Sequence, residues 1–478
     1  MKKLVSLLLS VVMAFSFCVP TFAAEEKAPG YNGDPVVIVR GIDFGGLIHE
    51  DGSKALKFDF VDVMTLIYDL ATGFAGKKED AFVDALLTYL QKLFAPISSD
   101  KEGKSVYDDV YMKAYPYPAG EIEELQEWED GEGGLVRTAI DFFGSENVYF
   151  FTYDWRKSPL TLSDELNAFV EMVKENTGKS KVDMGACSMG GMVATAYMYE
   201  YGTDSLDSLV YFSSAHNGTD MAGAALTGDI YTTGDFLNDY LMNMAEDTPI
   251  LKVLIKAVDA AGVFDYLADF LNGFVAKNKD RVYNELMRDY LGTSLGFWGL
   301  CCDKDFDSSV EYVFGSVKDD YPVIMAELAD IKEFLFSTEE VIDKALSDGV
   351  KVSITSHYND LLLPIYDEAV VHSDTIIESY LTSHGGTFAL FGEELTDEQI
   401  KGVDAEFISP DRMVDASTCR YPDITWYIKD EPHVGCKVGS EHAEFAMWIL
   451  SRDTQPTVYT DSRYPRFTAV DGEQNFIR

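Results

Sequence analysis

The sequence predicts an α/β protein with a doubly wound, mainly parallel sheet, and two observations support this fold class. Short apolar runs typical of buried strands alternate with longer segments typical of helices, as in consecutive βαβ units. The alternation stops after about residue 220 and resumes near residue 349, which predicts a helical insertion. A chain of 478 residues can form two or three domains, but the alternation favours one large core with insertions.

The first part of the core is predicted from apolar runs and glycine stops. VVIV, at residues 36–39, is apolar throughout and predicts a buried strand that runs into a glycine-containing loop. Ser163 is the predicted cap of a helix that ends at Gly178. In chain order, the sequence predicts a strand at 36–39, a small helical insertion at about 55–105, a helix at 134–144, a strand at 147–155, a helix at 163–178, a strand at 180–186, a helix at 190–202 and a strand at 206–215.

The second part contains the large insertion and the C-terminal end of the core. Segments such as ILKVLIKAVDAAG have the apolar spacing of helices. The sequence therefore predicts a helical cap or lid at about 221–345. GVKVSITSHYND and ITWYI then predict two strands, and EHAEFAMWILSRD predicts the closing helix. A single core domain is expected to span residues 24–478.

The charge of the chain is extreme, with 38 basic and 81 acidic side chains and a formal net charge of -43. Such a surface repels phosphate backbones, so no nucleic-acid partner is expected. Hydrophobic content of 47% and aromatic content of 13% are globular values and argue against general disorder. We interpret the charge as a solubility feature.

The N-terminal segment, residues 1–23, has the pattern of a signal peptide. Lys2 and Lys3 precede an apolar stretch, and TFA at residues 21–23 is a small-residue cleavage site. Pro20 cuts the stretch short of a membrane anchor. Phe17 is too bulky for the position before a lipidated cysteine, which argues against anchoring at Cys18. We therefore expect a secreted, extracellular protein without a transmembrane anchor.

Cysteine is sparse for an exported chain. Removal of Cys18 leaves five cysteines, an odd number, so at least one thiol is unpaired within a monomer. Cys187 is expected to be a buried free thiol, and a Cys419–Cys436 bridge stays open. The fold does not depend on a disulfide framework.

Ser188, in MGACSMGG, lies where a predicted strand ends and a helix begins. A nucleophile on such a sharp turn needs small residues two places either side, and Ala186 and Gly190 both satisfy this requirement. The start of the helix also places N–H groups near the serine oxygen, where negative charge would develop. A helix cap without chemistry is the alternative, but the strand and helix context favours a nucleophile.

A nucleophilic serine needs a base and an acid, in the chain order Ser, Asp or Glu, then His. His433 follows the predicted strand ITWYI and is the expected base, because a loop there can place its imidazole over the sheet. His442 falls on the first turn of the last helix and is less free to reach. The acid is Asp374 or Asp360, and the residues alone leave both open.

Two backbone N–H groups are expected to form an oxyanion hole. One belongs to Met189, directly after the serine. The other is expected from the loop after the first core strand, where we select Ile42. No metal site and no cofactor are expected: DKDFDSSVE resembles a calcium loop, but Ser308 replaces the required glycine and Phe314 the closing glutamate.

These motifs resemble the α/β-hydrolase fold and, within it, the lipases similar to lecithin:cholesterol acyltransferase. PVVIVRGI is similar to that family's PVVLVPGI, with Arg40 in place of proline, and FTYDWRKSP contains its YDWR. CSMGG resembles the HSMGG turn, with Cys187 in place of histidine, and AHNGTD is similar to its PHxGS segment. HSDTIIES resembles the acid loop GDGTVPLxS, which favours Asp374 over Asp360, although Thr375 replaces a glycine.

The resemblance covers the core in pieces, over residues 35–220 and 351–450, and none of the insertion. It implies a serine esterase or lipase acting on acyl or lipid esters, with the insertion as a lid or acyl-binding cap and transient contact with a lipid interface. An acyltransferase that passes the acyl group to an alcohol is one alternative. A non-catalytic binding protein on the same fold is another. The sequence does not predict the oligomeric state.

Overall fold

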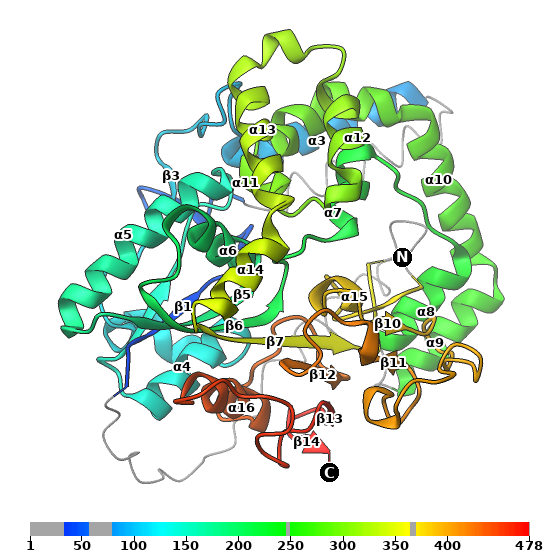
Figure 1. Ribbon diagram of the computed structural model, residues 1–478. Helices are drawn as coiled ribbons and strands as arrows, with labels where there is room; N and C mark the ends of the chain where they lie inside the picture. The colour runs from blue at the N-terminus through cyan, green and yellow to red at the C-terminus, as the bar shows by residue number, and fades with distance from the viewer. Residues whose placement is uncertain (1–32, 57–78, 245–248, 364–369, 478) are drawn as a thin grey trace.

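A computed structural model describes residues 33–56, 79–244, 249–363 and 370–477. Its centre is a sheet of eight strands in the order β14-β13-β12-β7-β6-β5-β1-β4 (Figure 1). Every neighbouring pair is parallel except β13 and β14. This confirms the predicted α/β class with a mainly parallel sheet. The strands are β1 (Val36–Val39), β4 (Val148–Phe151), β5 (Val182–Ser188), β6 (Leu206–Ser214), β7 (Lys351–Tyr358), β12 (Thr425–Lys429), β13 (Phe467–Val470) and β14 (Phe476–Ile477).

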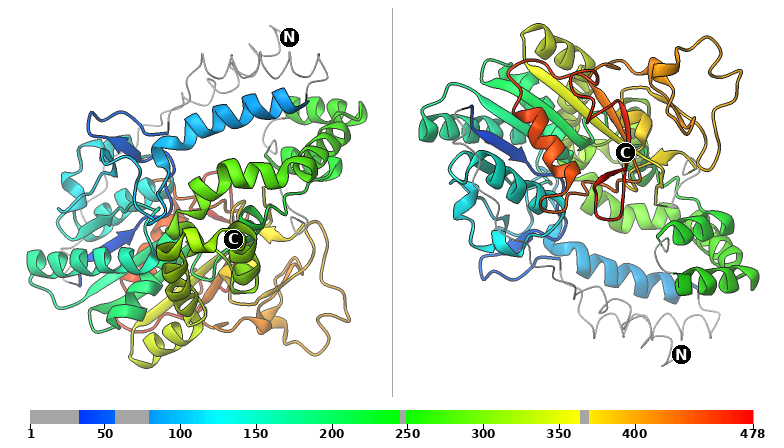
Figure 2. Two further views of the ribbon diagram at one scale, coloured as in Figure 1. Left: turned by 90° about the horizontal axis from the view of Figure 1, so that it is seen from above. Right: turned by 90° about the horizontal axis from the view of Figure 1, so that it is seen from below.

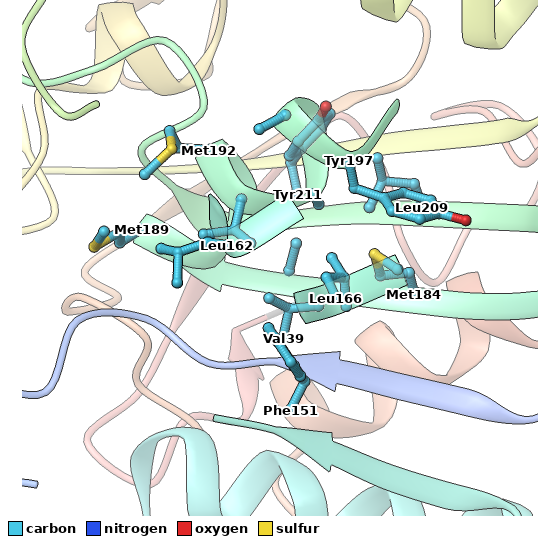
Figure 3. Packing of buried hydrophobic residues seen from close by; sticks show 14 of the residues in the cluster. Val39, Phe151, Leu162, Leu166, Met184, Met189, Met192, Tyr197, Leu209 and Tyr211 are labelled. Carbon is cyan, nitrogen blue, oxygen red and sulfur yellow. The ribbon is translucent and has the colours of Figure 1, made fainter. Parts of the chain in front are cut away.

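Helices cover both faces of the sheet, so its central strands are buried on both sides. Val37 and Val39 of β1 belong to one apolar cluster, whereas Val36 and Ile38 belong to another. This alternation follows from the two-residue period of a strand and explains why VVIV is apolar throughout. The first cluster includes helices α5 (Pro159–Thr177), α6 (Met189–Tyr201) and α14 (Thr338–Ser347), part of which Figure 3 shows, and the second includes α4 (Gly131–Phe143) and α16 (Glu441–Leu450).

The ends of helix α5 test the local sequence signals. Gly178 ends the helix with left-handed backbone angles (φ 69°, ψ 16°), as predicted. The prediction for its start is wrong, because the helix begins at Pro159 with Ser158 as the preceding residue. Proline lacks an N–H and is favoured in the first turn of a helix. Ser163 lies inside the helix, where its hydroxyl donates to the carbonyl of Leu160.

The chain between β6 and β7 is helical in the described residues. One part of it has an apolar core of its own, built around the buried side chains of Trp298 and Phe314. Its last helix, α14, packs on the main sheet instead. The other elements here are α7 (Asp220–Thr227), α8 (Gly234–Met244), α9 (Pro249–Ala260), α10 (Val263–Val282), the π-helix η5 (Tyr283–Gly292), α11 (Leu295–Trp298), α12 (Asp303–Phe314) and α13 (Pro322–Leu335).

The smaller predicted insertion contains helix α3 (Glu79–Phe94), while residues 57–78 lie outside the described residues. Helix α3 packs against the end of α10 and the start of η5 (Figure 2). Val83 and Leu87 form an apolar cluster with Leu286, and the Gln91 amide donates to the carbonyl of Glu285. Two segments about 190 residues apart therefore form one helical layer beside the sheet.

Short two-stranded ribbons complete the fold. They pair β2 (Leu47–His49) with β3 (Val110–Met112), β8 (Asp360–Leu361) with β9 (His372–Ser373), and β10 (Thr387–Phe388) with β11 (Val414–Asp415). The helix α15 (Ser379–Thr382) follows β9. Only the pair β8 and β9 bears on the candidate site.

All five cysteines outside the N-terminal segment are free and buried. The Cys419–Cys436 bridge considered from the sequence is therefore not formed, because the Cys419 thiol donates to the carbonyl of Ser383 and Cys436 lies in the second apolar cluster. The proposed signal peptide lies outside the described residues. Among the helices that the structure describes, none has the length and hydropathy needed to cross a membrane.

Candidate active site

Ser188 ends β5 and directly precedes α6, at the point where the chain turns sharply. Its backbone has φ 50° and ψ -127°, a conformation that costs energy for any residue except glycine. A Cβ on Gly190 would lie 2.5 Å from the carbonyl oxygens of Val39 and Arg40, so glycine is required there. The side chain of Ala186 is fully buried, so a methyl group fits at the other small position of the turn. The turn therefore has the geometry predicted for a strand–nucleophile–helix junction.

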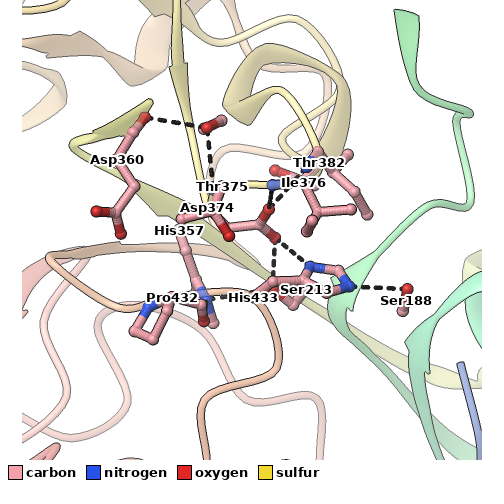
Figure 4. Close-up of polar contacts among 12 residues, drawn as sticks. Ser188, Ser213, His357, Asp360, Asp374, Thr375, Ile376, Thr382, Pro432 and His433 are labelled. Atoms are coloured by element: carbon pink, nitrogen blue, oxygen red, sulfur yellow. Dashed lines mark hydrogen bonds and ion pairs between the residues drawn. The ribbon is translucent and has the colours of Figure 1, made fainter. Parts of the chain in front are cut away.

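His433 and Asp374 lie in a hydrogen-bonded line with Ser188 (Figure 4). Nε2 of His433 is 2.8 Å from Oγ of Ser188, and Nδ1 is 2.8 Å from Oδ2 of Asp374. His433 follows β12, and Asp374 follows β9. The three predicted residues thus meet at the carboxyl ends of the strands, the edge where ligands bind to open α/β sheets. Their catalytic role is taken up below as a proposal.

Asp374 is held by more than His433. Its Oδ1 accepts hydrogen bonds from the N–H groups of Ile376 and Ile377, and its Oδ2 accepts from the Ser213 hydroxyl at 2.7 Å. Burial alone would raise the pKa of Asp374, but the nearby His433 and its hydrogen bond, with His357 and the bond from the Ile377 N–H, bring the pKa below the usual value of 3.8. The carboxylate is therefore ionised at neutral pH and oriented from both sides.

Asp360, the second choice for the acid, lies elsewhere. It starts strand β8, and its backbone carbonyl accepts from the hydroxyl of Ser373. Figure 4 places its carboxylate on the far side of Asp374 from His433. The side chain that contacts Nδ1 of the imidazole is that of Asp374, and the choice of Asp374 as the acid stays a proposal.

His442, the weaker candidate for the base, is fully buried on α16. Its Nδ1 lies 3.0 Å from the carbonyl oxygen of Gly435 and 3.2 Å from Oε1 of Glu431. It faces these groups and not Ser188, whose hydroxyl contacts His433. The early position of His442 in the helix explains the difference, because it leaves no loop to carry the ring to the serine.

Of the two expected oxyanion donors, Met189 follows Ser188 in the chain and Ile42 lies in a loop close to Ser188 in space. Met189 is the first residue of α6, so no carbonyl of its own helix can accept from its N–H. Ile42 follows Gly41, and a Cβ on Gly41 would lie 3.2 Å from Oγ of Ser188. The loop with Ile42 therefore borders the serine, and the donor roles of Met189 and Ile42 stay predictions.

Three polar residues near the hydrogen bonds of Ser188, His433 and Asp374 were not predicted from the sequence. Ser213 supports Asp374, as described above. Nδ1 of His357 lies 3.2 Å from the Ser213 hydroxyl oxygen, and burial, with the nearby His442, lowers the pKa of His357 to about 3, so the ring is neutral. Glu132 accepts from the N–H of Gly41. Each contact joins segments at least 91 residues apart, so no local pattern could have indicated them.

The segment that resembles a calcium loop forms the start of helix α12. Within the described ranges, no three His, Cys, Asp or Glu side chains gather in a way that could hold a metal ion. The candidate site brings together a serine hydroxyl, an imidazole and a carboxylate in the order that can activate a nucleophile.

Comparisons with known proteins add little to this geometry. No family model matches the sequence, and no curated protein matches it. A solved structure, the crystal structure of the Tle4-Tli4 complex, is similar over 69% of this chain and 75% of its own, with 12% identity and a TM-score of 0.27. A TM-score this low carries no argument about fold or function. The resemblance to lipases similar to lecithin:cholesterol acyltransferase therefore stays a proposal.

Proposed function

We propose that this protein is a serine hydrolase of carboxylic esters, with acyl or lipid esters as substrates. The observation that carries the proposal is the line of hydrogen bonds from Ser188 through His433 to Asp374. The positive φ at Ser188 supports it, because proteins keep such strain where it has a use. The fold alone would not suffice, since one fold hosts many activities.

In the proposed reaction, Oγ of Ser188 attacks the ester carbonyl carbon while Nε2 of His433 takes the hydroxyl proton. Asp374 stabilises the resulting imidazolium. The tetrahedral intermediate then collapses, the ester C–O bond breaks, and His433 gives its proton to the departing alkoxide. Water attacks the acyl-enzyme with His433 as base again, which releases the carboxylic acid and restores Ser188.

The developing negative charge on the carbonyl oxygen needs donors, for which we propose the N–H groups of Met189 and Ile42. The position of Met189 at the start of α6 supports this, because the positive end of the helix dipole points to the same place. Removal of one such donor typically costs about 100- to 1000-fold in kcat.

The proposed lipid-like substrate class rests on the helices between β6 and β7. Ile250 and Val253 of α9 are 85% and 70% exposed, and α10 exposes Tyr266, Leu267 and Leu271. Exposed apolar side chains on these two helices suit contact with acyl chains or a lipid aggregate. The charged residues of α9 are Lys252, Lys256 and Asp259, so this helix does not share the acidic excess of the whole sequence.

A fluorophosphonate probe tests the proposal directly, because it reacts with activated serine hydroxyls. We expect the purified protein to be labelled at Ser188, and Ser188→Ala to lose both labelling and hydrolysis of nitrophenyl esters. Ser145→Ala, at a surface turn, is the matched control and should behave as wild type. An unlabelled wild-type protein, or ester hydrolysis that survives Ser188→Ala, would contradict the mechanism.

A further inference from the structure

Glu132 is a titratable group at the candidate site to which the mechanism above gives no role. It lies in the first turn of α4, and its side chain is 18% exposed. Its Oε1 accepts a hydrogen bond of 2.6 Å from the N–H of Gly41, and its Oε2 lies 3.4 Å from Nε of Arg40. The carboxylate therefore holds the peptide group between Arg40 and Gly41, one peptide group before the one that carries the N–H of Ile42.

Glu132 and Ser188 also border the same small space. A Cβ placed on Gly41 would lie 2.7 Å from Oε1 of Glu132 and 3.2 Å from Oγ of Ser188. Only glycine at position 41 lets the loop, the carboxylate and the serine approach this closely. The start of α4 also contacts the loop of His433, since a Cβ on Gly131 would lie 3.9 Å from the carbonyl oxygen of Val434.

We propose that Glu132 is a positioning residue for the oxyanion loop, and that its ionised form is the active one. The proposal rests on the proposed function. The charged carboxylate accepts the Gly41 N–H in a short, charge-assisted bond, which fixes the loop so that the next N–H, of Ile42, faces the substrate. It also favours the imidazolium that forms on His433 during attack on the ester. Arg40 offsets part of the charge, with its Nε 3.4 Å from Oε2 of Glu132.

The surroundings of Glu132 set the pH at which this form is present. Burial raises the pKa of Glu132, whereas Arg40, the bond from Gly41 and His433 oppose the rise. Because the net direction is upward, the carboxylate loses its charge at a higher pH than an exposed glutamate does. The groups that face it from neighbouring elements are Arg40, Asp43, Tyr153, Cys187 and His433.

The Gly41 amide reports this ionisation without any need for enzyme activity. Arg40-Gly41 is the sole Arg-Gly pair in the sequence, so labelling with ¹³C-carbonyl arginine and ¹⁵N-glycine isolates its signal in an amide–carbonyl correlation spectrum. We expect this N–H to be strongly deshielded and to move upfield as the pH falls through the pKa of Glu132. In Glu132→Gln, which keeps an acceptor oxygen without charge, that titration should be absent.

Kinetics then test the functional part. Glu132→Gln should lower kcat by about tenfold and Glu132→Ala by about 100-fold, because alanine also leaves the Gly41 N–H unpaired beside the oxyanion. In both variants the acid limb of the pH profile should move to lower pH, since the Glu132 carboxyl, whose raised pKa makes it lose its charge early as the pH falls, is gone. Glu129→Gln, at an exposed glutamate just before the same helix, is the matched control and should behave as wild type.

The outcomes separate the two proposals. Variants with unchanged pH profiles and kcat, in a wild-type enzyme that the fluorophosphonate labels, would overturn the role of Glu132 and leave the proposed function intact. A lower kcat with an unmoved acid limb would also overturn it, because a merely structural residue gives that result. A wild type without labelling would overturn the proposed function and this inference with it, even where the Gly41 signal titrates.

Discussion

Ser188, Ser213 and Thr375 have positive φ angles without being glycine, at 50°, 47° and 84°. All three border the hydrogen-bonded line at the site: Ser188 starts it, Ser213 bonds Asp374, and Thr375 follows Asp374. Such conformations cost about 1–3 kcal/mol each and persist only when the surroundings enforce them. In the acid loop GDGTVPLxS that this segment resembles, a glycine occupies the position of Thr375. Thr375 has the positive φ that glycine would adopt easily.

Separate substitution of Asp374 and Asp360 tests which of them is the catalytic acid. We expect Asp374→Asn to lower kcat by about four orders of magnitude, because an amide no longer holds the imidazole in the required tautomer. Asp360→Asn should keep a kcat close to wild type. The measurement is kcat for a soluble nitrophenyl ester, with fluorophosphonate labelling as a check. A larger loss in Asp360→Asn would reassign the acid.

Removal of the Ser213 hydroxyl tests how the acid is held. Ser213→Ala deletes one of the bonds to Asp374 but leaves the two backbone donors and His433 in place. We expect kcat to fall by about tenfold, which corresponds to about 1.4 kcal/mol, with KM unchanged. A change in KM alone would indicate that Ser213 acts on substrate binding and not on the acid.

Secondary-structure elements with a strong local sequence pattern were predicted from the sequence. Contacts that depend on residues distant in the chain were not. The apolar run of β1 and the glycine that ends α5 carry their own signal, because burial and backbone angle act on those residues directly. Glu132 looks like an ordinary acidic residue in a first helical turn, and its contact with Gly41 is visible only in the folded chain. The order of Ser188, Asp374 and His433 was predicted because it follows from the topology.

The exposed face of α9 leads to a prediction about substrate form. We expect Ile250→Gln combined with Val253→Gln to lower hydrolysis of emulsified long-chain esters by about fivefold or more, because apolar contact area with the aggregate is lost. Hydrolysis of a soluble short-chain ester should not change. Ile477→Gln, at another exposed isoleucine, is the control. Equal losses on both substrates would contradict an interfacial role.

At the scale of the whole molecule, acidic residues outnumber basic ones about two to one. Ion pairs such as Lys332 with Asp307 and Arg420 with Asp343 neutralise part of the excess on the surface. The remainder repels itself and destabilises the compact state, although it favours solubility. Among the residues that the structure describes, most acidic and basic side chains are not buried, so dissolved ions can screen the repulsion between them.

Salt should therefore stabilise the protein. An increase from about 20 mM to about 500 mM sodium chloride shortens the screening length from about 20 Å to about 4 Å, which removes most long-range repulsion. We expect Tm to rise by several degrees in a thermal unfolding scan at pH 7. A constant or lower Tm would show that screened ion pairs outweigh the repulsion.

The hydrogen bond between Ser188 and His433 joins residues 245 positions apart in the chain. Ser188 is synthesised long before His433, and β12, which precedes the loop of His433, follows the helical segment and β7 in the chain. Chains fold from the N-terminus as they are made, so a partly made chain holds the serine without the imidazole. Under the proposed function, a chain made only as far as β7 therefore has the nucleophile but lacks the base that activates it.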